Sequence, residues 1–365
     1  MATKNSLSPL TEMIHQFTSD NKNSIFIKRF PTGMYHLDKA LGGGISAGLY
    51  VLGAIPNLGK STFVLQIAQN LSASGIPVLF FSFEMPKNRI AAKALSRQLY
   101  LHSRTMNYSS DMLLNEREMQ NEDLWKQIDQ IRNQVAEECK NLYIIERSNT
   151  LSSADDIEQM VLELMNTHSF KQKPVIIVDY LQILAGNEHS RFTSDKAIVD
   201  ANIRVFTKLA SEYQFPVLIV SSFNRSNYGS EVSLEAFKES GSIEYSADVI
   251  LGMQLSAMRK KGKEFNINEE KTKVPRDVDI IILKQRYGSS GNIIPFHYYA
   301  ANDYFEEVNE NTNFLTKYAH LPECYLNLVL FCNFLNDINY RTCICINKYS
   351  HIIFSPLTYT STFRL

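Results

Sequence analysis

The chain has 365 residues, 44% of them hydrophobic and 21% charged, which is typical of a globular protein with a sizeable core and argues against gross disorder. A formal net charge of −1 gives no overall attraction to nucleic acid, so any DNA contact needs a local patch of lysine and arginine. The N-terminus lacks a secretion signal, and no apolar run reaches the roughly 18 residues that would span a bilayer. We therefore expect a cytoplasmic protein with no membrane contact.

The first 30 residues are polar and mixed, and we interpret 1–30 as an N-terminal arm rather than a domain. Leu10, Met13, Ile14 and Phe17 have the spacing of one short amphipathic helix. The pattern then changes, so that one large domain is expected over 31–310.

Within 31–310, short apolar runs alternate with helical patterns, as expected for strands buried on both faces of a parallel sheet. Helical apolar spacing marks 124–135, 157–165 (with Ser152 and Ser153 as capping candidates) and 198–213. The fold class predicted is α/β, a doubly wound, mainly parallel sheet with helices on both faces. The charged stretch 258–276 is predicted to be a surface loop. The predicted strands are 49–53, 77–83, 142–146, 174–180, 216–222, 249–255 and 279–284.

The segment LYVLGAIPNLGKST places an apolar strand, a glycine-containing loop and a helix pattern in the order of a phosphate-binding loop. Backbone N–H groups of such a loop surround phosphate, the lysine (Lys60) neutralises its charge, and the hydroxyl (Ser61) holds Mg²⁺. The first glycine of the motif is replaced by Ala54, which is tolerable if that residue keeps a negative φ. The alternative is a plain loop with a capping serine. The predicted ATP-binding residues are Ala54, Ile55, Pro56, Asn57, Leu58, Gly59, Lys60, Ser61 and Thr62.

Two acids end predicted strands. Asp179 closes the run VIIVD, where the carboxyl end of a parallel strand would bring it to a ligand and let it hold Mg²⁺. Glu84 follows FFSF and could act as general base on the attacking water, or could simply precede a helix at Pro86.

The order of PTGMYHLDKALGGG, the phosphate loop, FFSFEM, VIIVDYLQIL, VLIVSSFNRS, FKESGSIEYSADVI and KQRYGSSG resembles the ATPase domain of DnaB-type replicative helicases over residues 30 to 307. In detail it is most similar to the helicase halves of primase-helicases from phages and mobile elements. The resemblance implies a RecA-like P-loop fold, ATP and Mg²⁺ as cofactors, a homo-oligomer (a hexameric ring) and single-stranded DNA in its channel. It assigns Lys60, Glu84 and Arg286 to catalysis. Lys284 and Arg286 would reach the neighbouring subunit's ATP site, with Arg286 as an arginine finger.

The chain departs from the family pattern in two ways. Where DnaB-type helicases carry a glutamine that senses the γ-phosphate, this chain has Ser222, which is too short to span the same distance directly. The short arm also cannot be the helical N-terminal domain of those helicases, so a separately encoded primase is a possible partner.

Candidate DNA contacts lie in two polar loops. Arg191 lies in the first, while Arg225, Asn227 and Lys238 belong to the second, where the aromatic rings of Phe223 and Tyr228 could stack on bases. All of these positions could equally be solvated loop residues.

The tail, 311–365, does not resemble the family, and its role is left open between an extra pair of strands with a helix, a partner-docking element and a divergent or frameshifted end of the reading frame. It holds four of the five cysteines, without zinc-ligand spacing, so free thiols are expected.

The leading hypothesis is an ATP-dependent helicase or translocase motor in replication, for a phage or mobile element. One alternative is a regulatory or loader ATPase, like RadA and KaiC, that switches partner binding without unwinding DNA. Another is a non-catalytic binding module.

Overall fold

The computed structural model describes residues 10–18, 27–106, 108–185, 194–237, 241–261, 266–308 and three short strands near the C-terminus. It divides into two compact units, Met1–Glu307 and Val308–Leu365. The arm contains α1 (Leu10–Thr18), which confirms the short amphipathic helix. No helix in the described ranges is long and apolar enough to cross a membrane.

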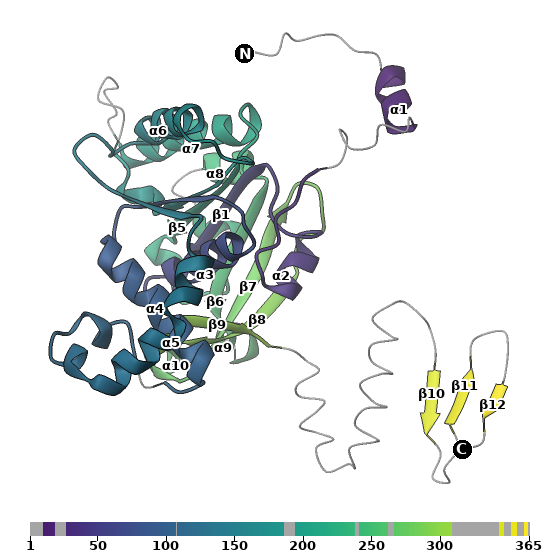
Figure 1. The fold of residues 1–365 in the computed structure, drawn as a ribbon. Helices are drawn as coiled ribbons and strands as arrows, with labels where there is room; N and C mark the ends of the chain where they lie inside the picture. The colour runs from purple at the N-terminus through teal and green to yellow at the C-terminus, as the bar shows by residue number, and fades with distance from the viewer. Residues whose placement is uncertain are drawn as a thin grey trace. The chain divides into compact units, whose positions relative to one another are not determined.

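A nine-stranded sheet forms the centre of the first unit, in the order β3-β2-β4-β5-β1-β6-β7-β8-β9 (Figure 1). The strands from β3 to β6 in that order are parallel, and β7, β8 and β9 continue the sheet as antiparallel neighbours. All seven predicted strands are confirmed, and the sequence pattern missed β8 and β9. The bounds are β1 Gly48–Ala54, β2 Val78–Ser82, β3 Leu142–Glu146, β4 Val175–Asp179, β5 Pro216–Ser222, β6 Val249–Leu255, β7 Arg276–Gln285, β8 Ile293–Tyr299 and β9 Tyr304–Glu307.

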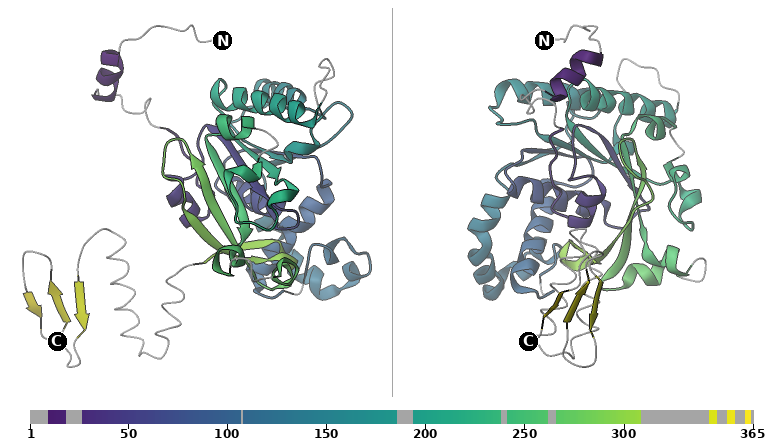
Figure 2. Two further views of the ribbon diagram at one scale, coloured as in Figure 1. Left: turned by 180° about the vertical axis from the view of Figure 1, so that it is seen from behind. Right: turned by 90° about the vertical axis from the view of Figure 1, so that its right-hand side faces the viewer.

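Helices pack on both sides of the sheet (Figure 2), which confirms the predicted architecture. One group contains α3, α4 and α5 in mutual contact, and the other joins α6, α7 and α8. β1, β2, β4 and β5 are buried along most of their length because both faces are covered. The helices are α2 Tyr35–Ala40, α3 Lys60–Ala73, α4 Lys87–Ser103, α5 Glu122–Glu138, α6 Ala154–Thr167, α7 Asp195–Ser211, α8 Gly241–Ser246, α9 Ser256–Lys261 and α10 Ile267–Thr272.

Capping side chains fix where the two outer helices α5 and α6 begin. The side-chain Oδ1 of Asn121 accepts from the backbone N–H of Asp123 at 2.9 Å. At α6, the Ser153 hydroxyl accepts from the Asp156 N–H, and the Asp156 carboxylate accepts from the Ser153 N–H at 2.9 Å. This reciprocal capping box confirms Ser153 as the cap, while Ser152 donates its backbone N–H to the same carboxylate.

The prediction of a surface loop over 258–276 is wrong. The stretch contains the end of α9 and all of α10, with Met258 buried and Arg276 starting β7 at 9% exposure. Glu269, Glu270 and Lys271, which contributed to the loop prediction, belong to α10, a helix that has no buried residue and packs along β6 and β7. A short polar helix at the surface and a polar loop can have the same composition.

The second unit contains the antiparallel strands β10 (Cys343–Ile346), β11 (Ile352–Ser355) and β12 (Ser361–Phe363). Cys139, whose side chain the structure describes, is a free thiol.

Candidate active site

The carboxyl ends of β1, β2, β4 and β5 meet at one edge of the sheet, which we call the phosphate edge. β5 and β6 are consecutive in the chain but lie on opposite sides of β1 in the sheet. Open α/β sheets bind ligands at such a point, where the strand order changes direction. A cavity of about 420 Å³ opens there. Its lining is Pro56, Asn57, Gly59, Lys60, Ser61, Thr62, Glu84, Met85, Lys93, Asp179, Tyr180, Ser222, Arg276, Tyr298 and Ala300.

The phosphate loop connects β1 to α3. Ala54 ends β1 and has no positive φ, so alanine fits the first glycine position as expected. Gly59 has φ 98° and caps α3, and a Cβ there would lie 2.8 Å from the rings of Tyr298 and Phe305. Glycine is therefore required both by the backbone and by the packing. The side chains of Ala54, Ile55 and Leu58 are buried in the core, so only the rest of the predicted loop faces the cavity.

Gly53, one place before the motif position, has a packing role. A Cβ on Gly53 would lie 2.3 Å from the Phe237 ring and 2.5 Å from the Phe223 ring. Those two rings contact each other edge to face, with centroids 5.0 Å apart. The glycine therefore lets the loop after β5 pack against the strand that carries the phosphate loop.

The Lys60 ammonium lies within the loop itself. It donates to the backbone carbonyls of Ala54 and Ile55, both at 3.2 Å. Burial lowers the pKa of Lys60 to about 8, and the nearby carboxylates of Asp179 and Glu84 oppose that shift. Neutral carbonyl oxygens are weaker partners for this half-buried ammonium than a charged phosphate would be.

Asp179 ends β4 and is fully buried. Burial raises its pKa to about 6, against the opposing effect of the nearby Ser61 hydroxyl. Neither carboxylate oxygen has a hydrogen-bond partner of good geometry among the described residues. Two buried, unpartnered oxygens beside a serine hydroxyl fit Mg²⁺, a hard cation that takes oxygen ligands and retains water. No cluster of three histidine, cysteine or acidic side chains occurs in the described ranges, so a cage of protein ligands is absent there.

Glu84 follows β2 and is exposed on the wall of the cavity. Its charge favours the ammonium form of Lys60 and the neutral form of Asp179, so it lies close to both. A solvent-accessible carboxylate on that wall can accept a proton from water.

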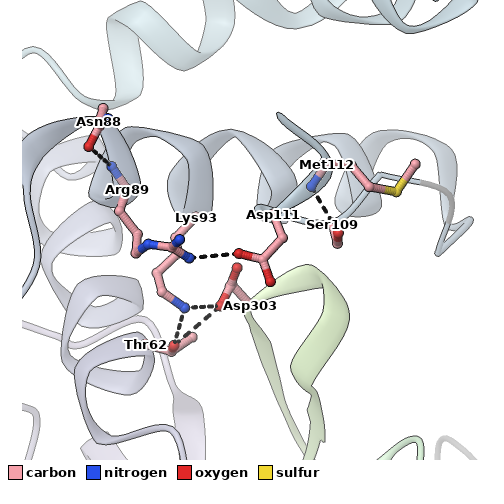
Figure 3. A network of polar contacts seen from close by, with 8 residues as sticks. All are labelled: Thr62, Asn88, Arg89, Lys93, Ser109, Asp111, Met112 and Asp303. Atoms are coloured by element: carbon pink, nitrogen blue, oxygen red, sulfur yellow. Dashed lines mark hydrogen bonds and ion pairs between the residues drawn. The ribbon is translucent and has the colours of Figure 1, made fainter. Parts of the chain in front are cut away.

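Thr62 lines the cavity, but its hydroxyl belongs to a buried polar network (Figure 3). Thr62 Oγ1 donates to Asp303 Oδ1 at 3.3 Å, and Lys93 Nζ donates to Thr62 Oγ1 at 3.3 Å. Lys93 also forms an ion pair with Asp303, which is 3% exposed. The network ties α3 and α4 to the turn before β9.

Sequence reasoning missed three basic residues of this site. Lys93 carries no local motif. Arg276 donates from Nη1 to the Asn57 carbonyl at 3.0 Å, and Lys271 Nζ donates to the Pro56 carbonyl at 3.1 Å. Both bind the phosphate loop from the stretch interpreted as a surface loop. The one available signal was Arg276 next to an apolar strand pattern.

Ser222 lies at the end of β5 and lines the cavity. Its backbone N–H donates to Gln182 Oε1 at 3.2 Å, and Gln182 Nε2 donates to the Ser221 hydroxyl at 2.8 Å. A glutamine is thus present next to the predicted sensor position, but it comes from the 3₁₀ turn Leu181–Ile183 after β4.

Lys284 and Arg286 do not lie at the phosphate edge. β7 runs antiparallel to β6, so Arg276 starts at the phosphate edge and the end of β7 lies at the other end of β1, next to Gly48. The seven residues of β1 separate the two edges by roughly 20 Å. The chain therefore does not bring Arg286 to its own Lys60.

The DNA-contact candidates are only partly described. Arg191 and Lys238 lie outside the described residues. Arg225 starts the 3₁₀ turn Arg225–Asn227, and Asn227 Nδ2 donates to the Glu235 carbonyl at 3.4 Å within the same loop. The suggestion that Phe223 stacks on bases is wrong, because its ring is 6% exposed and packs on Phe237.

The sequence model of the protein family 'DnaB-like helicase C terminal domain' matches residues 30–307 of this chain. The replicative DNA helicase DnaB of Helicobacter pylori strain J99 is 23% identical over 303 residues, covering 75% of this chain and 59% of that protein. The DnaB protein of Haemophilus influenzae is 28% identical over 267 residues, covering 72% and 52%. The chain thus spans little more than half of these relatives.

Two solved structures share the fold. One is an isolated ATPase domain, which has a TM-score of 0.66 at 20% identity and covers 83% of this chain and all of that one. The other is a DnaB-like replicative helicase, described with its interactions with primase. It has a TM-score of 0.65 at 19% identity, covering 84% of this chain and 68% of that one.

Proposed function

The chain belongs to the family of DnaB-like helicase C-terminal domains, and on that premise we propose that it is an ATP-driven helicase or translocase motor that acts on single-stranded DNA in replication. The observation that carries the proposal is the phosphate edge, where a half-buried lysine and a buried, unpartnered aspartate lie beside an exposed glutamate in one cavity. Curated relatives named replicative DNA helicases support the role in replication.

In this proposal the loop from Pro56 to Thr62 surrounds the phosphates of ATP, and the Lys60 ammonium leaves its carbonyl partners for the β- and γ-phosphate oxygens. Ser61 and Asp179 would hold Mg²⁺, and the bound ion would supply positive charge beside the phosphates. Glu84 accepts a proton from the attacking water. Ser222, next to Gln182, lies where the end of β5 can respond to the γ-phosphate.

Arg286 would act on a neighbouring copy of the chain. Its position at the edge opposite Lys60 supports this assignment, because the strand length separates the two side chains in one copy. In a ring, the phosphate edge of one copy would meet the Lys284 and Arg286 edge of the next. Arg286 would then stabilise charge on the transferring phosphoryl group.

The proposal extends to partners and domains. Residues 31–310 would be the motor and 1–30 its arm, with 311–365 assigned no role. A hexameric ring, a primase encoded separately and a cytoplasmic location in a phage or mobile-element replication system complete it. Arg225 and Asn227, in the loop after β5, remain candidates for contacts to DNA phosphates.

The test is single-stranded-DNA-stimulated ATP hydrolysis by the full chain and by Lys60→Ala. We expect the variant to lose hydrolysis by at least about a hundredfold, because one phosphate-binding charge is removed from the transition state. Unchanged hydrolysis in Lys60→Ala would place the site elsewhere.

A regulatory ATPase remains the second candidate, favoured by the serine at position 222. Strand displacement on forked DNA separates the two. Hydrolysis together with unwinding supports the helicase, whereas hydrolysis without unwinding supports a switch.

A further inference from the structure

The segment 241–248 precedes β6 in the chain, and the ATP site leaves it without a role. Its described part contains α8, and the chain then continues through Ala247 and Asp248 into β6. Both residues assigned to the neighbour's site, Lys284 and Arg286, contact this segment. These contacts suggest that α8 and Asp248 set the position of the basic pair.

Backbone carbonyls at the end of α8 hold the two cations. Lys284 Nζ donates to the Glu244 carbonyl at 2.5 Å, and Arg286 Nη2 donates to the Tyr245 carbonyl at 3.2 Å. The last carbonyls of a helix have no partner within the helix, so they are free to accept from these side chains. The cations are therefore fixed to α8 as well as to their own strand.

Asp248 supplies the charged contact. Its Oδ1 lies 2.9 Å from Arg286 Nη1, and its backbone carbonyl accepts from the Arg286 N–H at 2.8 Å. The same residue thus fixes both the backbone and the guanidinium of Arg286. The Asp248 side chain is 23% exposed and that of Arg286 is 44% exposed, so the pair lies at the surface without being free to rotate.

The second carboxylate oxygen of Asp248 is attached to the central strand. Asp248 Oδ2 accepts from the Leu49 N–H at 2.8 Å, while the Asp248 N–H donates to the Leu49 carbonyl at 2.8 Å. A Cβ on Gly48 would lie 3.1 Å from Oδ2, so glycine leaves room for the carboxylate. Asp248 therefore joins Arg286 to the first residues of β1, the strand that carries the phosphate loop at its other end.

From this geometry we infer that Asp248 is a positioning residue for Arg286, which it orients toward the ATP site of a neighbouring copy. The inference rests on the proposed function, in which Arg286 is an arginine finger. The two observed contacts use two of the five N–H donors of a guanidinium, and the others are available for a phosphate oxygen. A carboxylate that fixes one side of the group reduces the freedom that would otherwise be lost when the neighbour docks.

The test is steady-state ATP hydrolysis with single-stranded DNA, together with titration of Mg²⁺-ADP, on the full chain and Asp248→Asn. Asparagine keeps an oxygen for the Leu49 N–H but loses the charge that holds Arg286. We expect kcat to fall by about 10- to 100-fold, as for a small misplacement of a catalytic group. The Kd of Mg²⁺-ADP should stay within about twofold, because the chain's own phosphate loop is unchanged. The matched control is Asp129→Asn, which removes the carboxylate of an exposed ion pair with Arg132 on α5.

Mixed assemblies separate action on Arg286 from damage to β1. Mixing Asp248→Asn with Lys60→Ala copies should restore hydrolysis, because an intact phosphate loop then meets an intact Arg286. Mixing Asp248→Asn with Arg286→Ala should restore nothing. The reverse pattern, with recovery only in the Arg286→Ala mixture, would show that Asp248 supports its own phosphate loop and would overturn the inference.

The Arg286→Ala variant, assayed alone, separates the arginine-finger role of Arg286 from the positioning role of Asp248. If it hydrolyses ATP normally, the arginine-finger assignment fails and the inference fails with it. If Arg286→Ala is inactive while Asp248→Asn is normal, only the inference fails. Should Asp248→Asn not fold, as judged by circular dichroism, Asp248→Glu keeps the charge but displaces the guanidinium by one methylene, and the same mixing pattern is expected.

Discussion

The two edges of the sheet carry their charges in opposite ways. At the phosphate edge, Asp179 is fully buried with both oxygens unpartnered in the described structure, and Lys60 has only backbone carbonyls as partners. At the opposite edge, Arg286 is half-exposed and has a carboxylate partner. The phosphate edge therefore holds charges that a ligand would stabilise, whereas the Arg286 edge is already satisfied and oriented.

This difference indicates where binding free energy comes from. Burial lowers the pKa of Lys60 and raises the pKa of Asp179, and both shifts favour the neutral forms. Keeping these groups charged at that edge therefore lowers the stability of the chain. Phosphate and Mg²⁺ would restore partners to both groups. The Arg286 edge needs no such compensation, and its contribution would depend on the neighbour alone.

The largest expected effect tests this division directly. Arg286→Ala should lower kcat for ATP hydrolysis by about 10³-fold or more while leaving Mg²⁺-ADP affinity unchanged, because arginine fingers act in the transition state. Stopped-time hydrolysis assays and calorimetric titration measure the two quantities. Arg132→Ala, which removes an exposed arginine of α5, is the control. A loss of nucleotide affinity in Arg286→Ala would contradict the separation of the edges.

Asp179→Asn should stabilise the nucleotide-free chain at pH 7 by about 1–3 kcal/mol, because burial raises the pKa of Asp179 from 3.8 to about 6. The ionised carboxylate costs stability above about pH 6, and this cost disappears below the unfolded pKa of 3.8. Urea unfolding at pH 7 and pH 4 measures the gain and its expected loss. An Asp179→Asn variant less stable than the parent at pH 7 would show that the carboxylate is well satisfied.

The affinity for Mg²⁺-ADP should be highest between about pH 6 and about pH 8, the pKa values of Asp179 and Lys60. Below this window Asp179 is protonated and loses its capacity to hold Mg²⁺, and above it Lys60 loses its charge. Each limb should change the affinity by about tenfold per pH unit once the group is neutral. Titrations on Asp179→Asn should show a flatter acidic limb, whereas an unchanged limb would assign it to the nucleotide itself.

The smallest expected effect concerns the loop backbone. Asn57 has φ 64°, a left-handed conformation that costs residues with a Cβ about 1 kcal/mol, less for asparagine. Asn57→Ala should lower the free energy of unfolding by about 1 kcal/mol, and Asn57→Gly should not lower it. Thermal unfolding of the two variants measures the difference. If Asn57→Ala and Asn57→Gly were equally stable, the left-handed backbone at residue 57 would not lower the stability of the phosphate edge.

Most of the fold was predictable because its central strands are buried on both faces. Runs such as VIIV (175–178) and LYVL (49–52) are apolar at every position, and helix stripes, one of them capped by Ser153, lie between such runs. β8 was missed because its buried residues alternate with exposed or partly exposed ones, and β9 because Phe305 is its one buried residue, so no continuous apolar run marks either strand. The sequence of α10 was indistinguishable from a charged loop.

The site was predictable where a motif carries it. Lys60, Glu84 and Asp179 reach one cavity because parallel strands end at the same edge. Lys93, Arg276 and the Thr62–Asp303 contact depend on residues more than 30 positions apart in sequence, which local patterns do not connect. The base-stacking role for Phe223 failed because the ring fills space left by Gly53, a relation that only the packing shows.

If Arg286 completes a neighbour's ATP site, as we propose, its separation from Lys60 has a genetic consequence. A copy with an intact phosphate loop but no Arg286 would still enter assemblies and would disable the site of a normal neighbour. Such an allele should be dominant, and its inhibition should grow with its share of the protein in the cell. An allele that prevents the chain from folding should be recessive, because it never joins an assembly.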